Sequence, residues 1–187
     1  MGGDKYRIGN QNDIYFITCT VVDWVDLFTR KEYAIILVDS LNYCIANKGL
    51  EVFSYIIMSS HIHIICRVNE PNTMSGFLRD PIAIGFKKFT SKALAEKIIE
   101  IGESRREWLL NKFEFEGKKS GKIKDYKIWT VDNHAIEIFG YINIEEKANY
   151  IHQNPVKAMI VYSAEQYVFS SAIDYADGIG LVKITKY

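Results

Sequence analysis

The sequence has few of the features that mark specialised classes of protein. It contains three prolines in 187 residues, no internal repeat and no low-complexity tract, so we expect one compact domain. No apolar run approaches the roughly 20 residues of a transmembrane helix, and the N-terminal run MGGDKYRIGN lacks the apolar core of a signal peptide. We therefore expect no membrane partner.

Paired cysteines and an excess of charge are also missing. Cys19, Cys44 and Cys66 lie far apart in apolar segments and form no CxxC pair, so buried, reduced thiols and a cytoplasmic protein are expected. The 23 basic residues are balanced by 23 acidic ones. Any binding of nucleic acid would therefore have to come from local patches rather than from the net charge.

Apolar residues are abundant, at 48% of the chain, which is enough for a substantial core. A single domain over 1–187 is expected, with a core of about 13–175, a basic loop at 117–127 and a tail at 176–187. The connections are short, so the sheet should be antiparallel, and the order of elements indicates an α+β fold. The spacing of apolar residues predicts strands over 13–22, 50–58, 61–68 and 126–131, and helices over 30–47, 73–78, 84–101, 105–113 and 144–154.

Local signals add detail to these elements. Thr29, with Glu32 three residues later, predicts a capping box for the helix over 30–47, and Gly49 is expected to end that helix in a left-handed conformation. The pattern leaves open whether 50–58 and 61–68 form one bent strand or a hairpin. Four side chains of the helix over 84–101 are expected to face the core: Phe86, Phe89, Leu94 and Ile98.

The segment 55–67 is the most informative of the chain. It carries His61 and His63, separated by one isoleucine, in a run that is typical of a buried strand. Side chains alternate between the faces of a strand, so the two imidazoles share one face and Ile62 lies on the other. Two imidazoles on one rigid strand are half of a metal site. Such a pair alone is more often structural, so the function depends on what completes it.

A second polar group lies on the helix predicted over 144–154. Tyr150 and Asn154 are four residues apart and share one helix face, whereas His152 should point elsewhere. An amide oxygen added to two neutral imidazoles makes a three-ligand site with open positions for water or substrate. A divalent cation held there would polarise a phosphodiester, and a tyrosine hydroxyl beside it would be placed to attack phosphorus.

At these residues the chain resembles a known family. MSSHIHII resembles the His-hydrophobic-His motif of the single-tyrosine HUH transposases, and KANYIHQNPVKAMIV resembles their tyrosine-helix motif, closest to the REP-associated tyrosine transposases. YFITCTVVDWVDLF and EQYVFSSAIDY resemble the same branch, so the resemblance covers about 13–175. Two places depart from the family pattern. Ser59-Ser60 replaces the usual Pro-Asn before the first histidine, and Met159 replaces a usual glycine.

The resemblance implies a ferredoxin-like antiparallel sheet with helices on one face, the HUH motif on a central strand and the tyrosine on a late helix. It implies a metal-dependent single-strand DNA transesterase of transposase type that cleaves and rejoins DNA near hairpins. Tyr150 would form a 5′-phosphotyrosine, and the ligands of Mg²⁺ or Mn²⁺ would be His61, His63 and Asn154. Single-stranded or hairpin DNA would be the partner, and a monomer is favoured over a homodimer.

Lysines provide candidate phosphate contacts, although a solvated surface is an equal alternative for them. Two other functions remain open: a non-catalytic nucleic-acid-binding protein on the same fold, and an unrelated metal-dependent hydrolase that uses the histidine pair. His134 is expected to be structural or to face DNA. The candidate DNA-binding residues are Lys87, Lys88 and Lys92 of the helix over 84–101, and Lys118, Lys119 and Lys122 of the basic loop.

Overall fold

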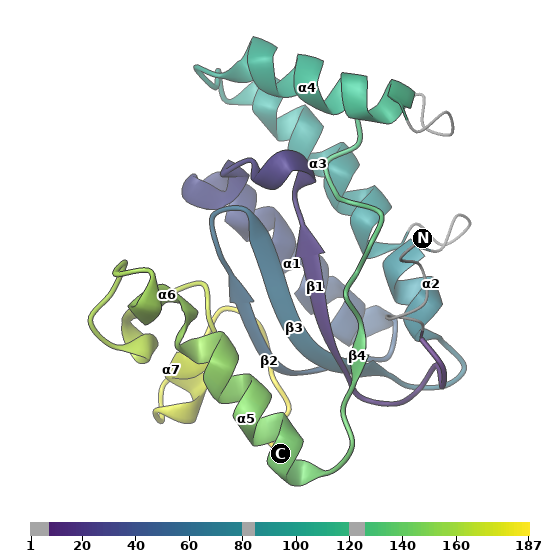
Figure 1. Ribbon diagram of the computed structural model, residues 1–187, viewed down its shortest axis with the longest axis vertical. Coiled ribbons are helices and arrows are strands. Elements are labelled where there is room, and N and C mark those ends of the chain that lie inside the picture. The colour runs from purple at the N-terminus through teal and green to yellow at the C-terminus, as the bar shows by residue number, and fades with distance from the viewer. Residues whose placement is uncertain (1–7, 80–84, 120–125) are drawn as a thin grey trace.

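The computed structural model describes residues 8–79, 85–119 and 126–187 and centres on an antiparallel sheet of four strands (Figure 1). The strand order is β2-β3-β1-β4. β-branched and aromatic residues dominate the three long strands, because such side chains pack well on a pleated surface. The strands are β1 (Tyr15–Thr20), β2 (Leu50–Ile57), β3 (His61–Val68) and β4 (Ile136–Glu137).

The helices follow in chain order around this sheet. Three short 3₁₀ turns accompany them: η1 (Val22–Trp24), η2 (Leu27–Thr29) and η3 (Ala164–Gln166). The α-helices are α1 (Lys31–Asn47), α2 (Met74–Arg79), α3 (Phe86–Glu100), α4 (Arg106–Lys119), α5 (Tyr141–His152), α6 (Asn154–Lys157) and α7 (Ala172–Tyr175).

The order of the strands gives the expected ferredoxin-like topology. β3 lies between β1 and β2 and runs antiparallel to both, so β1, α1 and β2 form a split βαβ unit. β2 and β3 form a hairpin through 58–60, which answers the question that the pattern left open. The α+β class and the position of the two histidines on a central strand are confirmed.

One face of the sheet, here called the closed face, is covered by α1 and α3 (Figure 1). Ile62 and Ile64 of β3 point to this face and are fully buried in the core cluster that also contains Leu37 of α1 and Leu94 of α3. The same core contains Cys19, Cys44 and Cys66, and all three are buried free thiols, as expected. This larger core supplies most of the apolar burial that stabilises the domain.

The opposite face of the sheet, here called the site face, carries Phe16, His61, His63 and Ile65. It is covered in part by α5, which buries Ile144, Ala148 and Ile151 against it (Figure 1). The predicted fold class, with helices on one face of the sheet, describes the closed face. It holds for α1 and α3, whereas the tyrosine helix packs on the other face because its own apolar stripe needs a second surface.

Several local expectations differ from the structure. Thr29 ends η2 and donates its hydroxyl to the Asp26 carbonyl, so the N-cap of α1 is Arg30, without a side-chain bond. Phe89 is 49% exposed instead of facing the core. The segment around Trp129 makes only an isolated bridge to Val21, and the fourth strand forms at 136–137 instead. Gly49 does adopt the left-handed conformation, with φ of 65°.

The ends of two helices also differ from those that the sequence predicts. α4 continues through Lys118 and Lys119, so the first residues of the expected basic loop are helical, and 120–125 lies outside the described residues. Pro155 does not end the helical path, because it occupies the first turn of α6, where its missing N–H costs nothing. The tail over 178–187 forms no strand, although the Thr185 N–H donates to the Val52 carbonyl. In the described part of the chain, no helix is both long and apolar enough to cross a membrane.

Candidate functional site

The two histidines stand together on the site face, at the end of β3 nearest the hairpin turn. Their ring centroids are 4.7 Å apart, and His63 stacks on Phe16 at 5.2 Å. His61 pairs with Thr20 of β1 and His63 pairs with Thr18. The alternation of side chains along a strand therefore produces the shared face that the sequence predicted.

Hydrogen bonds fix how each imidazole is turned. His63 Nδ1 lies 2.8 Å from the Thr18 hydroxyl, and His61 Nδ1 lies 3.3 Å from the Ser60 hydroxyl. These contacts leave Nε2 of each ring as the nitrogen available to a ligand. Burial lowers the pKa of His61, and burial together with the neighbouring His61 lowers the pKa of His63 to about 3. Both rings are therefore neutral near pH 7, which is the form that binds metal ions.

Tyr150 lies directly beside this pair in the same chain. Its ring makes an edge contact with His63 at 5.8 Å and with Phe16 at 6.1 Å, while 47% of the residue stays exposed. The helix places it there because Ala148 and Ile151 bury the inner stripe of α5, which leaves Tyr150 at the edge of that stripe. The phenol is thus held against an imidazole and is accessible to solvent.

Asn154 follows Tyr150 by one helical turn at the start of α6. Its amide nitrogen donates to the Tyr150 carbonyl at 2.7 Å and to the Ile151 carbonyl at 3.3 Å. The amide oxygen is therefore the atom that remains for a ligand. Among the described residues no three His, Cys, Asp or Glu side chains gather as a metal cluster. Two neutral imidazole nitrogens and an amide oxygen each offer a lone pair, so the donor types are suitable for a divalent cation.

His152 anchors the tyrosine helix instead of joining the site. It is buried, and its Nε2 lies 3.0 Å from the Ser54 hydroxyl and 2.9 Å from the Ser171 hydroxyl. Burial lowers the pKa of His152 to about 4. This cluster ties α5 to β2 and to the segment before α7, so it sets the position of Tyr150 relative to β3. The expectation that His152 points away from Tyr150 is confirmed.

Two lysines that the sequence reading missed lie around the tyrosine. Lys157 Nζ is 5.6 Å from the centre of the Tyr150 ring, and Lys147 Nζ is 5.7 Å from the centre of the Phe16 ring. They bring positive charge to a site whose imidazoles are neutral, which suits an anionic substrate. Lys147 comes three residues before Tyr150 and Lys157 seven residues after it. This helical spacing could have predicted both lysines, because it places them on the same side as the tyrosine.

The lysines chosen from the sequence lie elsewhere. Lys87 Nζ donates to the Thr130 carbonyl at 2.8 Å, and Lys92 Nζ lies 3.9 Å from the Glu96 carboxylate, both on the helix that covers the closed face. Lys118 and Lys119 pair with glutamates of α4. Lys88 is exposed on α3, and Lys122 lies outside the described residues. Their contact with DNA stays a prediction.

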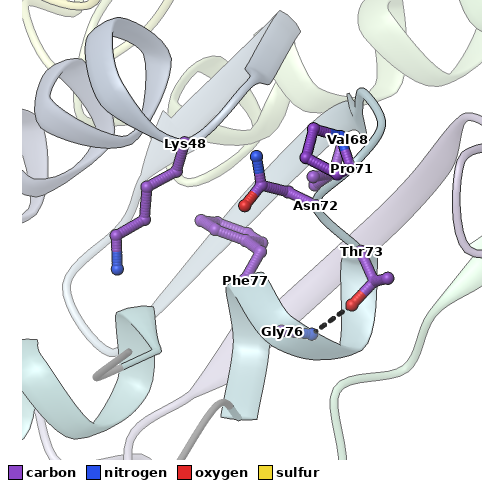
Figure 2. Close-up of a pocket in the computed structure, with 7 residues that line it drawn as sticks. All are labelled: Lys48, Val68, Pro71, Asn72, Thr73, Gly76 and Phe77. Carbon is purple, nitrogen blue, oxygen red and sulfur yellow. Dashed lines mark hydrogen bonds between the residues drawn. The ribbon is translucent and has the colours of Figure 1, made fainter. Parts of the chain in front are cut away.

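Figure 2 shows a small pocket at the other end of β3. It is lined by Val68, by residues at the start of α2 and by Lys48 (Figure 2). Val68 is seven residues from His61 along the strand, which is roughly 23 Å at about 3.3 Å per residue. The pocket is therefore separate from the histidine pair.

Ser59-Ser60 and Met159 are the two departures from the family pattern. The Ser59 and Ser60 carbonyls accept hydrogen bonds from the backbone of Phe28 and Val21, so the turn before His61 is held to the segment after β1. Met159 has φ of 55°, a left-handed conformation that favours glycine, the residue of the pattern that the sequence resembles.

The similarity of this chain to known proteins is found in its fold and not in its sequence. No protein-family model matches the chain, and no curated protein matches it in sequence. Among solved structures, a REP-associated tyrosine transposase bound to a REP hairpin is similar, with a TM-score of 0.61 and 15% sequence identity. The match covers 98% of this chain and 94% of that chain. At this identity the likeness establishes a shared fold over nearly the whole length of both chains.

Proposed function

We propose that this chain is a metal-dependent single-strand DNA transesterase of transposase type, which cleaves and rejoins DNA near hairpins through a 5′-phosphotyrosine. The observation that carries the proposal is the contact between Tyr150 and His63 of the histidine pair within one chain. The shared fold with a transposase bound to a REP hairpin supports DNA as the partner. The contact also supports a site that one chain can complete, as in a monomer.

The chemistry follows from the positions of the side chains. The Tyr150 oxygen would form a bond to phosphorus while the bond from phosphorus to the 3′-oxygen breaks. The 3′-oxygen would keep the electron pair and take up, through solvent, the proton that the phenol loses. The phosphodiester energy would be kept in the phosphotyrosine, so attack by a 3′-hydroxyl could rejoin the strand without a further energy source. Lys147 and Lys157 would attract and hold the backbone phosphates around Tyr150.

His61, His63 and Asn154 would hold Mg²⁺ or Mn²⁺ through the two Nε2 atoms and the amide oxygen. Such an ion supplies Lewis-acid stabilisation of the charge that develops on the phosphate. Thr18 and Ser60 would keep the two imidazoles turned so that Nε2 faces the substrate, as hydrogen-bond partners of ligating imidazoles do in metal sites.

Covalent trapping tests the proposal. The protein is incubated with labelled hairpin-bearing single strands and Mn²⁺, and a protein–DNA adduct is sought by denaturing electrophoresis. The adduct should form with the unmodified chain and be absent in Tyr150→Phe. Tyr43→Phe is a matched control, because Tyr43 is 58% exposed and lies on α1, which covers the closed face. This control should form as much adduct as the unmodified chain.

The other outcomes decide between the alternatives. If Tyr150→Phe still forms the adduct, the nucleophile is another residue. If the unmodified chain binds the hairpin strands and forms no adduct with any of them, a non-catalytic DNA-binding protein is the better description. Hydrolysis of small substrates that depends on His63 and is unaffected by Tyr150→Phe would indicate the metal-dependent hydrolase.

A further inference from the structure

Trp24 is an exposed aromatic residue at the edge of the candidate site. It is the last residue of η1, directly after β1, and 65% of it is exposed. Its ring makes an edge contact with His61 at 5.5 Å between centroids. An indole open to solvent beside the histidine pair presents an aromatic face of the kind on which nucleic-acid bases stack.

The backbone holds Trp24 in this exposed position. Asp23 and Trp24 have φ values of 51° and 57°, in the left-handed region that a residue as bulky as Trp24 rarely adopts. The turn is kept by the Trp24 N–H, which donates to the Val21 carbonyl at 3.0 Å, and by an ion pair between Asp23 and Lys112 of α4. Backbone strain of this kind is concentrated where a side chain is presented for function.

Trp24 and Tyr150 lie on opposite sides of the histidine pair along β3. Trp24 contacts His61, next to the hairpin turn. Tyr150 contacts His63 and also Phe16, whose strand partner is Ile65, farther from the turn. Successive ring contacts therefore run from Trp24 through the two histidines to Tyr150. A phosphate placed over the histidines would have the nucleophile on one side and the indole on the other.

We infer that Trp24 is a stacking platform for the base on the 5′ side of the scissile phosphate, the nucleotide that leaves with the free 3′-hydroxyl. The inference rests on the proposed function. In an in-line displacement the leaving oxygen departs on the side opposite to the attacking oxygen. With Tyr150 attacking phosphorus, the 3′-oxygen leaves toward Trp24 with its electron pair. Stacking there keeps that nucleotide in place, so its 3′-hydroxyl can attack the phosphotyrosine in the rejoining step.

A binding cycle tests the assignment on protein that cannot cleave, with abasic sites scanned along the oligonucleotide, while the cleavage position is mapped separately with the unmodified chain. Labelled hairpin oligonucleotides are titrated by fluorescence anisotropy with Tyr150→Phe protein, with and without Trp24→Ala. Loss of one base-stacking platform should weaken binding roughly 5- to 100-fold. The loss should vanish on an oligonucleotide that is abasic at the nucleotide 5′ of the mapped cleavage position and persist when the abasic site lies 3′ of it. Trp24→Phe, which keeps an aromatic face, should recover part of the affinity.

Tyr43→Ala is the matched control, because Tyr43 is an exposed aromatic residue of α1, on the closed-face side of the sheet. It should bind like the parent protein. The inference is overturned if the effect of Trp24→Ala is the same on every abasic oligonucleotide, or if the coupled base lies 3′ of the cleavage position. An adduct without coupling to any base would refute the platform alone. Coupling to one base without any adduct would refute the transesterase and keep the stacking site.

Discussion

Neighbouring residues of β3 enter two very different environments. Ile62 and Ile64 point to the closed face, where α1 and α3 cover them completely. His61 and His63 point to the site face, where α5 covers a smaller apolar cluster and leaves Tyr150 partly exposed beside His63. One strand therefore builds the core with one set of side chains and the candidate site with the other.

The difference shows how a weakly covered face can be made rigid. The imidazoles cannot be held by packing from a second full helix layer, so hydrogen bonds from Thr18 and Ser60 turn them instead. Their strand gains its rigidity from Ile62 and Ile64 on the other side. The stability of the domain and the precision of the site should thus depend on different residues of the same strand.

Replacing a histidine should show most clearly that the two faces of the sheet have different roles. In His63→Ala we expect adduct formation to fall on the order of a thousandfold, about 4 kcal/mol in activation free energy, because the proposed cation site loses one of its ligands. The free energy of unfolding should change by only about 1 kcal/mol, since the closed-face core is untouched. Single-turnover trapping and urea unfolding measure the two quantities. A loss of stability as large as the loss of activity would show that His63 is structural.

The opposite result is expected one residue away. Ile64 is fully buried on the closed face, so Ile64→Ala should lower the free energy of unfolding by about 3 kcal/mol through lost burial and the cavity left behind. The fraction that remains folded should still form adduct at a rate within a few fold of the unmodified chain. Urea unfolding and trapping at low temperature measure both. A specific loss of adduct rate in well-folded protein would show that the two faces are not independent.

The period of two in β3 made this division predictable from the sequence. Strand geometry alone placed His61 opposite to Ile62 in side-chain direction, and helical spacing placed Asn154 one turn from Tyr150. The ferredoxin-like strand order and the closed-face core followed from the family resemblance and the apolar pattern. The directions of the side chains depend on local periodicity, which a single sequence carries, whereas the strand order does not and came from the resemblance.

The features that the sequence did not predict depend on contacts between residues far apart in the chain. The packing of α5 on the site face depends on a second apolar cluster formed with Phe16 and Ile56, which no local pattern reveals. Phe89 has helical spacing suited to the core, yet the packing of α3 leaves it exposed. The contact of Trp24 with His61 joins a turn to a strand nearly 40 residues later, and nothing in the turn sequence indicates it.

The contribution of Glu103 to the stability of the fold should depend on pH. Glu103 is buried beside Tyr33 and pairs with Arg30. Burial alone would raise its pKa, but hydrogen bonds, led by the Arg105 backbone N–H, outweigh burial and lower the pKa from 4.5 to about 2. A carboxyl with a lowered pKa stabilises the fold above pH 4.5, and this contribution is lost as the pH falls from 4.5 toward 2.

In Glu103→Gln we therefore expect a loss of about 1–2 kcal/mol at pH 7, kept modest because Arg30 is partly exposed. The difference from the unmodified chain should shrink between pH 4.5 and 2, as measured by urea unfolding across that range. Adduct formation at pH 7 should be unchanged, because the residue lies in the helical layer. A difference in stability that is constant with pH would show that the Glu103 charge contributes nothing.

The smallest expected effect is on hairpin binding, and it is measured by replacing one lysine from each side of the sheet. Lys157 lies against the Tyr150 ring, whereas Lys92 is on α3 beside Glu96. Removing one phosphate contact should weaken hairpin binding roughly 3- to 5-fold and reduce the slope of log affinity against log salt by about 1 in Lys157→Ala. Lys92→Ala should change neither quantity if DNA stays on the site face. Equal losses in both variants, measured by anisotropy at several salt concentrations, would mean that the strand also reaches the closed-face helices.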